Sequence, residues 1–244
     1  MGTSASNAAT FDTVLKGGIV VNQDGAGERD VGIVDGSITA IGTLDAASAG
    51  EVVDCTGLHI LPGVIDSQVH FREPGATHKE DLETGSRAAV LGGVTCVFEM
   101  PNTNPLTTSE EALADKVARG RHRMHCDFAF WVGGTRENAA DVAELERLPG
   151  AAGIKVFMGS STGSLLVEDD DGVREILRRT RRRAAFHSED EFRLRDRADL
   201  RVEGDPASHP VWRDEVAALQ CTERLVGIAE EVGARIHVLH ISTA

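Results

Sequence analysis

The chain has 244 residues, with 25 lysines and arginines against 39 aspartates and glutamates, so its formal net charge is −14. This acidic balance argues against non-specific binding to nucleic acid or to an anionic membrane surface. No apolar run approaches the roughly 18 residues of a membrane span, and the polar residues 1–10 lack a secretory signal and are expected to be disordered. Four cysteines without a CxxC pair are typical of a reduced, cytoplasmic protein.

Residues 11–57 are predicted to form a small antiparallel β module. Short β-branched runs alternate there with Gly, Asp and Asn, and Asp35-Gly36 between two of them is a strong hairpin signal. No residue types suited to catalysis cluster in this module, so the functional site is expected in the remainder of the chain.

Residues 58–244 follow a different rhythm, in which apolar strands alternate with amphipathic helices. This pattern is typical of α/β proteins with parallel βαβ units. The predicted strands are 60–68, 93–99, 127–132, 153–158, 183–187 and 235–240, and the predicted helices are 78–91, 109–121, 136–147, 172–181 and 213–232. Six strands are fewer than the eight of a (β/α)₈ barrel, and residues 241–244 come directly after the sixth. We therefore expect an incomplete barrel that lacks its last two units.

Polar residues interrupt or follow the apolar strands at similar places. His70 and Arg72 precede a Pro-Gly turn after the first strand, and Lys155, His187 and His240 occur at or near the ends of later strands. Strand ends carry the chemistry of α/β barrels, so these residues are predicted to form one site.

Several segments together resemble the dihydroorotases of the amidohydrolase superfamily. The matching segments are Asp66 to Gly75, Thr77 to Asp81, Gly92 to Thr95, Met100 to Pro105, Gly153 to Phe157, His187 to Glu189 and His240 to Thr243. The resemblance implies a metal-dependent (β/α)₈ barrel of the TIM type with a small N-terminal β-sandwich, which hydrolyses or closes a cyclic amide.

The chemistry of the residues agrees with such a reaction. Zinc activates water and polarises a carbonyl, and His70, His187 and His240 are nitrogen ligands that zinc accepts. Lys155 lies within an apolar strand, where an ammonium is costly to bury unless it is salt-bridged or reaches solvent. A neutral lysine can instead add CO₂ and become a carbamate ligand, and the resemblance implies this modification and a catalytic role at Lys155.

Gln68 departs from the HxH pattern of the superfamily, because it stands where a histidine is expected. In the superfamily's two-metal site, the HxH pair, the carbamate and an aspartate of the eighth strand hold one metal. The carbamate and the two later histidines hold the other. We expect one or two zinc ions, and a single ion would lie at Lys155, His187 and His240.

Substrate binding is assigned to Arg72 and Asn102. Arg72 can grip a carboxylate bidentately, unless it forms an ordinary ion pair with Glu73 or Asp81. Asn102 offers an amide that donates and accepts hydrogen bonds, or it is a turn residue. Glu189, beside His187, is either an orienting residue or a solvated loop acid, and so is Asp190.

The predicted function is zinc-dependent interconversion of N-carbamoyl-aspartate and dihydroorotate, a step of pyrimidine biosynthesis. One alternative is an allantoinase or hydantoinase that hydrolyses another cyclic ureide. A second alternative is a non-catalytic dihydroorotase-like assembly partner, which Gln68 favours. The expected partners are a small anionic substrate and a second copy of the chain in a homo-oligomer, and the truncated barrel is not expected to be active alone.

Overall fold

The computed structural model describes residues 10–159 and 163–243. The chain divides into two compact units, residues 1–63 and residues 64–244. The sequence placed this division after residue 57. The segment 1–10, predicted to be disordered, lies outside the described residues except for Thr10.

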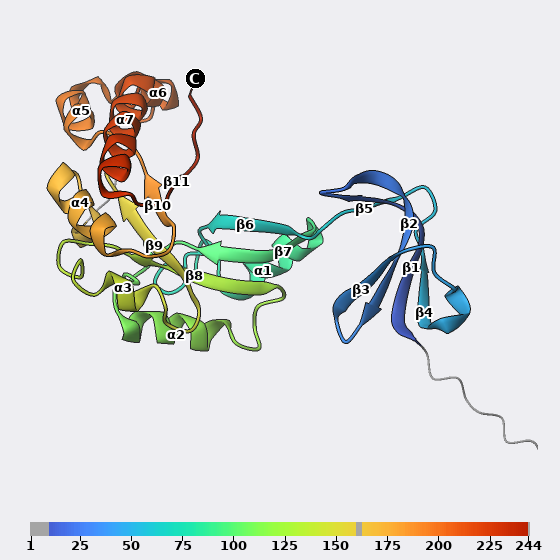
Figure 1. The fold of residues 1–244 in the computed structure, drawn as a ribbon. Coiled ribbons are helices and arrows are strands. Elements are labelled where there is room, and N and C mark those ends of the chain that lie inside the picture. Colours follow the sequence, from blue (N-terminus) through green and yellow to red (C-terminus); the bar gives the residue numbers. More distant parts are fainter. Residues whose placement is uncertain (1–9, 160–162, 244) are drawn as a thin grey trace, which may run out of the picture. The chain divides into compact units, whose positions relative to one another are not determined.

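The first unit is one five-stranded sheet, drawn in blue to cyan in Figure 1. Its strands are β1 (Phe11–Asn22), β2 (Gly25–Val34), β3 (Ser37–Gly42), β4 (Ala49–Asp54) and β5 (His59–Ile60), and a 3₁₀ turn, η1 (Ala46–Ser48), precedes β4. The predicted hairpin is present, because Asp35 and Gly36 join β2 to β3 with positive φ angles of 49° and 72°. Two residues with φ > 0 are what a tight hairpin turn of this twist requires.

One expectation for this unit needs correction. The sheet is mixed rather than antiparallel, because β4 and β5 both pair with β1 in parallel. The described residues form one sheet here, and the second layer of the predicted β-sandwich is not among them. The hairpin signal favoured antiparallel pairing throughout, but β4 and β5 pair with successive stretches of β1, Phe11 to Lys16 and Ile19 to Val20. Residues 55–58 therefore continue the chain in the same direction along one edge of β1.

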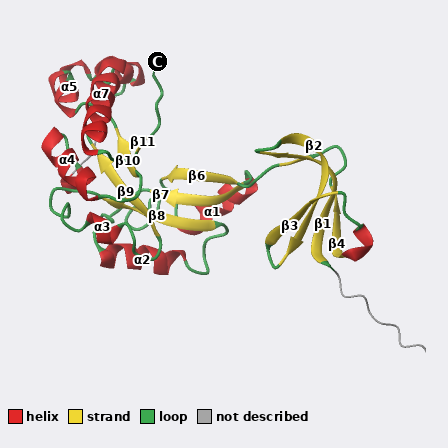
Figure 2. Cartoon of the chain, in the orientation of Figure 1, coloured by secondary structure: helices red, strands yellow, loops and turns green. Residues whose placement is uncertain are grey.

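The second unit is a six-stranded sheet in the order β6 to β11, and every neighbouring pair is parallel. Figures 1 and 2 show a curled sheet with helices along its outer side. The strands are β6 (Val64–Val69), β7 (Val94–Glu99), β8 (Asp127–Gly133), β9 (Ala151–Phe157), β10 (Ala184–His187) and β11 (Ile236–Val238). The α-helices are α1 (Leu82–Leu91), α2 (Glu110–Gly120), α3 (Val142–Leu145), α4 (Asp170–Arg179), α5 (Glu191–Asp196), α6 (His209–Trp212) and α7 (Glu215–Val232). Short 3₁₀ turns are η2 (Gly163–Leu165), η3 (Ala198–Leu200) and η4 (Pro206–Ser208).

The side chains of the strands alternate between the two faces of this sheet. One set is fully buried against the helices and forms the larger core with Leu113, Ile176 and Leu225; it includes Val97, Phe130, Val132, Ile154, Val156 and Phe186. The intervening positions face the inner side, where Trp131 and Ala185 pack with Met100 and Leu239 in a smaller cluster. Lys155 and His187 have the parity of this inner set. The strand period therefore directs both toward the interior of the curl.

The predicted elements differ from the observed ones in several places, and the helix predicted at 78–91, for example, begins at Leu82. The first barrel strand was predicted at 60–68, but residues 59–60 belong to the first sheet and the strand begins at Val64. The helix predicted at 136–147 is reduced to α3, because Asn138 closes a turn with Thr135 and bonds to the Gly133 and Thr108 carbonyls. The segment 191–213 contains α5 and α6, which were not predicted. No described helix is long and apolar enough to cross a bilayer.

Candidate active site

Arg72 lies in the loop after β6 and has an unusual backbone conformation. Its φ angle is +64°, in the left-handed region that non-glycine residues seldom occupy, and such outliers are concentrated at functional sites. Glu73 and Asp81, the two acids considered above as its ion-pair partners, have other partners. Glu73 binds Arg123 through both carboxylate oxygens, at 2.7 and 3.1 Å, and Asp81 caps α1 at the Thr84 amide. Among the described residues no ion pair involves Arg72, so its half-buried guanidinium is available to an anion.

The loop that carries Asn102 is held against the Arg72 loop. The Asn104 amide donates to the Pro74 carbonyl at 3.1 Å. Gly75, with φ of +105°, is required at this contact, because a Cβ there would lie 2.6 Å from both the Cβ and the carbonyl oxygen of Asn104. The two predicted substrate-binding residues therefore belong to two loops with a fixed relation to each other.

His70 directly follows β6 and lies near Arg72, Asn102 and Lys155. Burial lowers its pKa to about 4, and the nearby charges of Arg72, Lys155 and His240 act in the same direction. A hydrogen bond with the Asn102 side chain opposes this shift in pKa. The imidazole is consequently neutral at pH 7, which is the form that binds a metal.

Lys155 is buried, with 1% of its surface exposed, and its Nζ donates to the Val156 carbonyl at 2.8 Å. The same Nζ lies 3.9 Å from the centre of the Phe157 ring, which stacks on His187. Within the described part of the chain no acidic side chain forms an ion pair with it, so the salt-bridged alternative is not realised there. Burial holds the pKa of Lys155 well below its usual range and favours the neutral amine.

His187 and His240 come together although they are 53 residues apart in sequence. His187 ends β10, His240 follows β11, and Nδ1 of the first lies 3.0 Å from Nε2 of the second. His240 has a left-handed φ of +38°, which brings its ring next to that of His187. Partial burial and the neighbouring His187 both lower the pKa of His240.

Glu189 contacts the other ring nitrogen of His187. Its Oε2 lies 2.7 Å from His187 Nε2, and Arg213 binds both carboxylate oxygens of Glu189. Burial alone would raise the pKa of Glu189, but the bonds from His187 and Arg213 outweigh it and bring the pKa to about 2. Glu189 is therefore an ionised carboxylate bonded to His187 and not a solvated loop acid.

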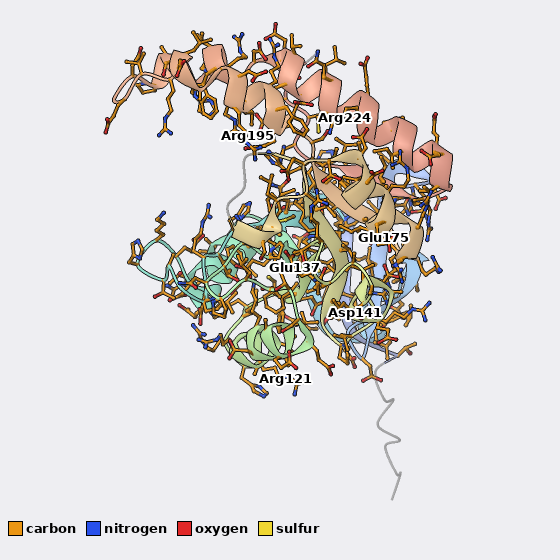
Figure 3. The ribbon with its side chains drawn as sticks, turned by 90° about the vertical axis from the view of Figure 1, so that its left-hand side faces the viewer. Arg121, Glu137, Asp141, Glu175, Arg195 and Arg224 are labelled. Atoms are coloured by element: carbon orange, nitrogen blue, oxygen red, sulfur yellow. The ribbon has the colours of Figure 1, made fainter. Side chains whose placement is uncertain are left out.

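The residues on either side of Glu189 are also anchored. Ser188 exchanges a hydrogen bond of 2.8 Å with Thr222 on α7. Asp190 caps α5 at the Arg193 amide and pairs with Arg224, which is labelled on α7 in Figure 3. Asp190 thus fixes the loop without contacting the histidines.

The arrangement fits a zinc ion at the two later histidines. Two nitrogens bound to one tetrahedral zinc at 2.0–2.1 Å lie about 3.3 Å apart, close to the observed 3.0 Å. Among the described residues no three His, Cys, Asp or Glu side chains form a group that could hold a metal. Within the part of the chain that the structure describes, a third protein ligand would then be of another residue type, and Lys155 would be an anionic oxygen ligand only as a carbamate. Gln68 lies on β6, two residues before His70, and its neutral amide oxygen is a weak zinc ligand.

A cavity of about 430 Å³ opens beside the histidine pair. His187, Glu189 and His240 line it together with Arg213 and apolar side chains, among them Leu219, Val238 and Leu239. His209, from the long segment before α7, also lines it and packs edge-on against Trp212. The sequence did not reveal the role of Arg213, because no motif or spacing links Arg213 to Glu189, which lies 24 positions earlier.

A family model described as dihydro-orotase-like matches residues 57–155. Allantoinases from Rubrobacter xylanophilus and Deinococcus radiodurans are 36% and 33% identical to the chain; each match covers 96% of the chain and 53% or 54% of the relative. A dihydroorotase from Methanosarcina mazei is 35% identical over 86% of the chain and 47% of that protein.

The solved L-hydantoinase (dihydropyrimidinase) of Arthrobacter aurescens superposes with a TM-score of 0.86 and 27% identity. That match covers 95% of the chain and 53% of the hydantoinase. The chain spans about half the length of the curated relatives it matches. It belongs to the dihydroorotase-like cyclic amidohydrolases of the amidohydrolase superfamily.

Proposed function

We propose that the protein in its full natural length is a zinc-dependent dihydroorotase, built on a (β/α)₈ barrel of which the six strands β6 to β11 are the first. Dihydroorotase interconverts N-carbamoyl-aspartate with dihydroorotate and water. The observation that carries the proposal is Lys155, a fully buried lysine on the inner face whose amine donates to a backbone carbonyl. A purely structural role offers no reason to place an ammonium there without an acid.

A neutral Lys155 amine supports the carbamate on chemical grounds. The Nζ lone pair attacks the carbon of CO₂, an N–C bond forms, one C=O π pair moves onto oxygen, and the nitrogen releases a proton. The product is an N-carboxylate, which has the charge and oxygen donors that zinc accepts. Lys155 Nζ lies over the Phe157 ring, which stacks on His187, so the carbamate oxygens would lie toward the histidine pair.

The residues that would hold the ion are His187, His240 and carbamylated Lys155, with His70 nearby. Bound there, zinc would supply an activated water and a polarised amide carbonyl. Gln68 in place of histidine weakens a second position, so we propose one tightly held zinc per chain. The neutral state of His70 suits either a ligand or a hydrogen-bond partner of Asn102.

Arg72 and Asn102 are proposed to bind the carboxylate of dihydroorotate. Arg72 has no ion-pair partner among the described residues, and its loop is fixed against that of Asn102 through Gly75 and Asn104. An unneutralised guanidinium near a metal site favours a substrate with a carboxylate. Replacing Arg72 by Ala should lower kcat/KM for dihydroorotate by a factor that corresponds to a loss of about 2–4 kcal/mol of transition-state stabilisation. The zinc content should be unchanged.

The second candidate is an allantoinase, which the names of the relatives from Rubrobacter and Deinococcus favour. Allantoin has no carboxylate, so its turnover should not depend on Arg72. The test is to purify the protein with zinc and bicarbonate and to measure turnover of dihydroorotate, N-carbamoyl-aspartate, allantoin and hydantoin, for wild type and Arg72→Ala. Turnover of allantoin alone, unaffected by Arg72→Ala, would overturn the dihydroorotase proposal. Zinc binding without turnover of any of the four would favour the non-catalytic assembly partner.

A further inference from the structure

Four side chains form a continuous chain of contacts at the mouth of the curled sheet. His240 Nε2 faces His187 Nδ1 at 3.0 Å, His187 Nε2 faces Glu189 Oε2 at 2.7 Å, and Arg213 binds both oxygens of Glu189. The side chains of His187 and Glu189 are only 15% and 13% exposed. The two nitrogens of the His187 ring therefore have different partners, a histidine on one side and a carboxylate on the other.

We propose that Glu189, held by Arg213, is a positioning residue that presents Nδ1 of His187 as a metal-binding lone pair. This inference rests on the proposed function in one respect, namely that the ion bound at His187 and His240 is the zinc of the hydrolase. Glu189 itself contacts neither substrate nor metal in this scheme.

The chemistry follows from the carboxylate. An ionised carboxylate only accepts hydrogen bonds, so the short contact with Nε2 requires a proton on that nitrogen. A neutral imidazole with a proton on Nε2 has none on Nδ1, and the free Nδ1 lone pair points toward His240. Histidines that bind metals commonly donate their other N–H to a carboxylate, which fixes both the tautomer and the orientation of the ring.

Arg213 explains why Glu189 stays in place. The bidentate arginine fixes the plane of the carboxylate, and the bonds of Ser188 to Thr222 and of Asp190 to Arg224 fix the backbone on either side. Arg213 belongs to the segment between α6 and α7 and is distant in sequence from β10, the strand that carries His187. The long connection after β10 thus contributes a side chain that supports a metal ligand.

The first experiment measures zinc affinity by competition with a chelator, with protein of full natural length prepared in bicarbonate. Glu189→Ala should weaken zinc binding roughly 10- to 100-fold, the range for loss of such an outer partner. Glu189→Gln should fall between this variant and wild type, because its amide oxygen still accepts the Nε2 proton. Glu231→Ala is the matched control, since it removes another carboxylate bound to an arginine, Arg174, away from the histidines, and it should keep wild-type affinity.

The second experiment reads the tautomer directly in metal-free protein, by ¹⁵N NMR of the imidazoles with His187 assigned from a His187→Gln variant. Wild type should show one tautomer, protonated at Nε2, and Glu189→Ala should show a mixture of the two. Unchanged zinc affinity and an unchanged tautomer in Glu189→Ala would overturn the inference. If wild type binds no zinc, the proposed function fails, while the NMR result still decides the role of Glu189. If Glu189→Ala does not fold, Glu189→Gln and Arg213→Ala provide the same comparison.

Discussion

Lys155 is the residue whose environment most restricts what the site can do. Its amine is buried, bonded to a backbone carbonyl, and close to an aromatic ring and two histidines. A charged ammonium in that position would repel a cation bound at His187 and His240. A carbamate would attract the same cation, because it carries the opposite charge.

Replacing Lys155 by Ala should therefore abolish both zinc binding and turnover. The anionic oxygen ligand is lost, and two histidines alone hold zinc weakly. Metal content measured by mass spectrometry, together with turnover, tests this expectation. Short carboxylic acids supplied with zinc should restore part of the activity, because they can occupy the space of the carbamate. Full zinc content and full activity in the variant would rule out the carbamate.

The sequence predicted which side chains would lie near one another better than it predicted their contacts. His187, His240 and Lys155 could be placed together because parallel strands present their carboxyl ends at one edge, and strand parity decides which side chains face inward. The partner of Glu189 could not be predicted, since Arg213 lies in a long connection without a regular period. The left-handed backbone at Arg72 and His240 also leaves no pattern in one sequence.

At the scale of elements, α2 is joined to β7 by a buried ion pair. Lys116 on α2 contacts Glu99 at the end of β7, both side chains are 1% exposed, and Lys116 also donates to the Met100 carbonyl. Burial raises the pKa of Glu99 and lowers the pKa of Lys116. The pair lies on the helix-facing side of the sheet, in the position of a structural link between helix and strand.

Replacing one member of this ion pair should lower the free energy of unfolding more than replacing both members. Lys116→Met leaves the Glu99 carboxylate buried without its cation, and should lower the free energy of unfolding by about 3–5 kcal/mol. The double variant Lys116→Met with Glu99→Gln should recover much of that loss, because no uncompensated charge remains. Chemical denaturation of the two single variants and the double variant gives the coupling. Equal losses for the single and double variants would contradict this account.

Asp30 has a comparable role in the first sheet, where it joins three segments. Its carboxylate binds the Lys16 ammonium and accepts from the amides of Gly17 and Leu44. Burial acts to raise its pKa, but these bonds outweigh burial and bring the pKa to about 2. A folded-state pKa below the unfolded value of 3.8 means that the unfolded chain binds more protons, so the stabilisation is present above pH 3.8 and is lost as the pH falls through 2.

Asp30→Asn should therefore destabilise the first unit at pH 7 by about 1–2 kcal/mol, allowing for screening by nearby solvent. The difference from wild type should shrink as the pH falls from 4 toward about 2, where the native carboxyl also becomes protonated. Denaturant titrations at several pH values, followed by a signal from the first unit, measure this difference. A difference independent of pH would show that the charge of Asp30 is not responsible.

Regular elements were predictable where local pattern and long-range packing agree. Helices such as α2 and α4 have side-chain caps, from Ser109 and Asp169, and lie within two residues of their predicted ranges. The prediction of a helix at 136–147 was wrong, because the Asn138 side chain forms hydrogen bonds with three backbone groups in a turn. Such bonds compete with the helical backbone bonds, and helical periodicity in the sequence does not reveal them. The prediction of an antiparallel module was wrong for a related reason. The parallel pairing of β4 and β5 with β1 is decided by contacts distant in sequence.

At the scale of the whole molecule, the second unit has the strand order and helix placement of an open β/α barrel, whose sheet is not closed among the described residues. β6 and β11 are the two ends of the sheet, and the described residues pair each of them on one side only. On the end strand β6, the side chains of Val64 and Ile65 are 55% and 61% exposed. Apolar side chains beside an unpaired strand edge are the usual starting point for edge-to-edge association.

The chain of 244 residues should therefore associate as its concentration rises, and a charge at the edge should reduce this association. Val64→Lys places an ammonium on β6, whose unpaired backbone groups would otherwise accept another strand. Val211→Lys is the matched control, because Val211 is 50% exposed but lies on helix α6 and on neither end strand. Sedimentation velocity over a concentration series distinguishes the variants. Association that persists in Val64→Lys and disappears in Val211→Lys would place the contact at α6, and a monomer at every concentration would show that the end strands are not adhesive.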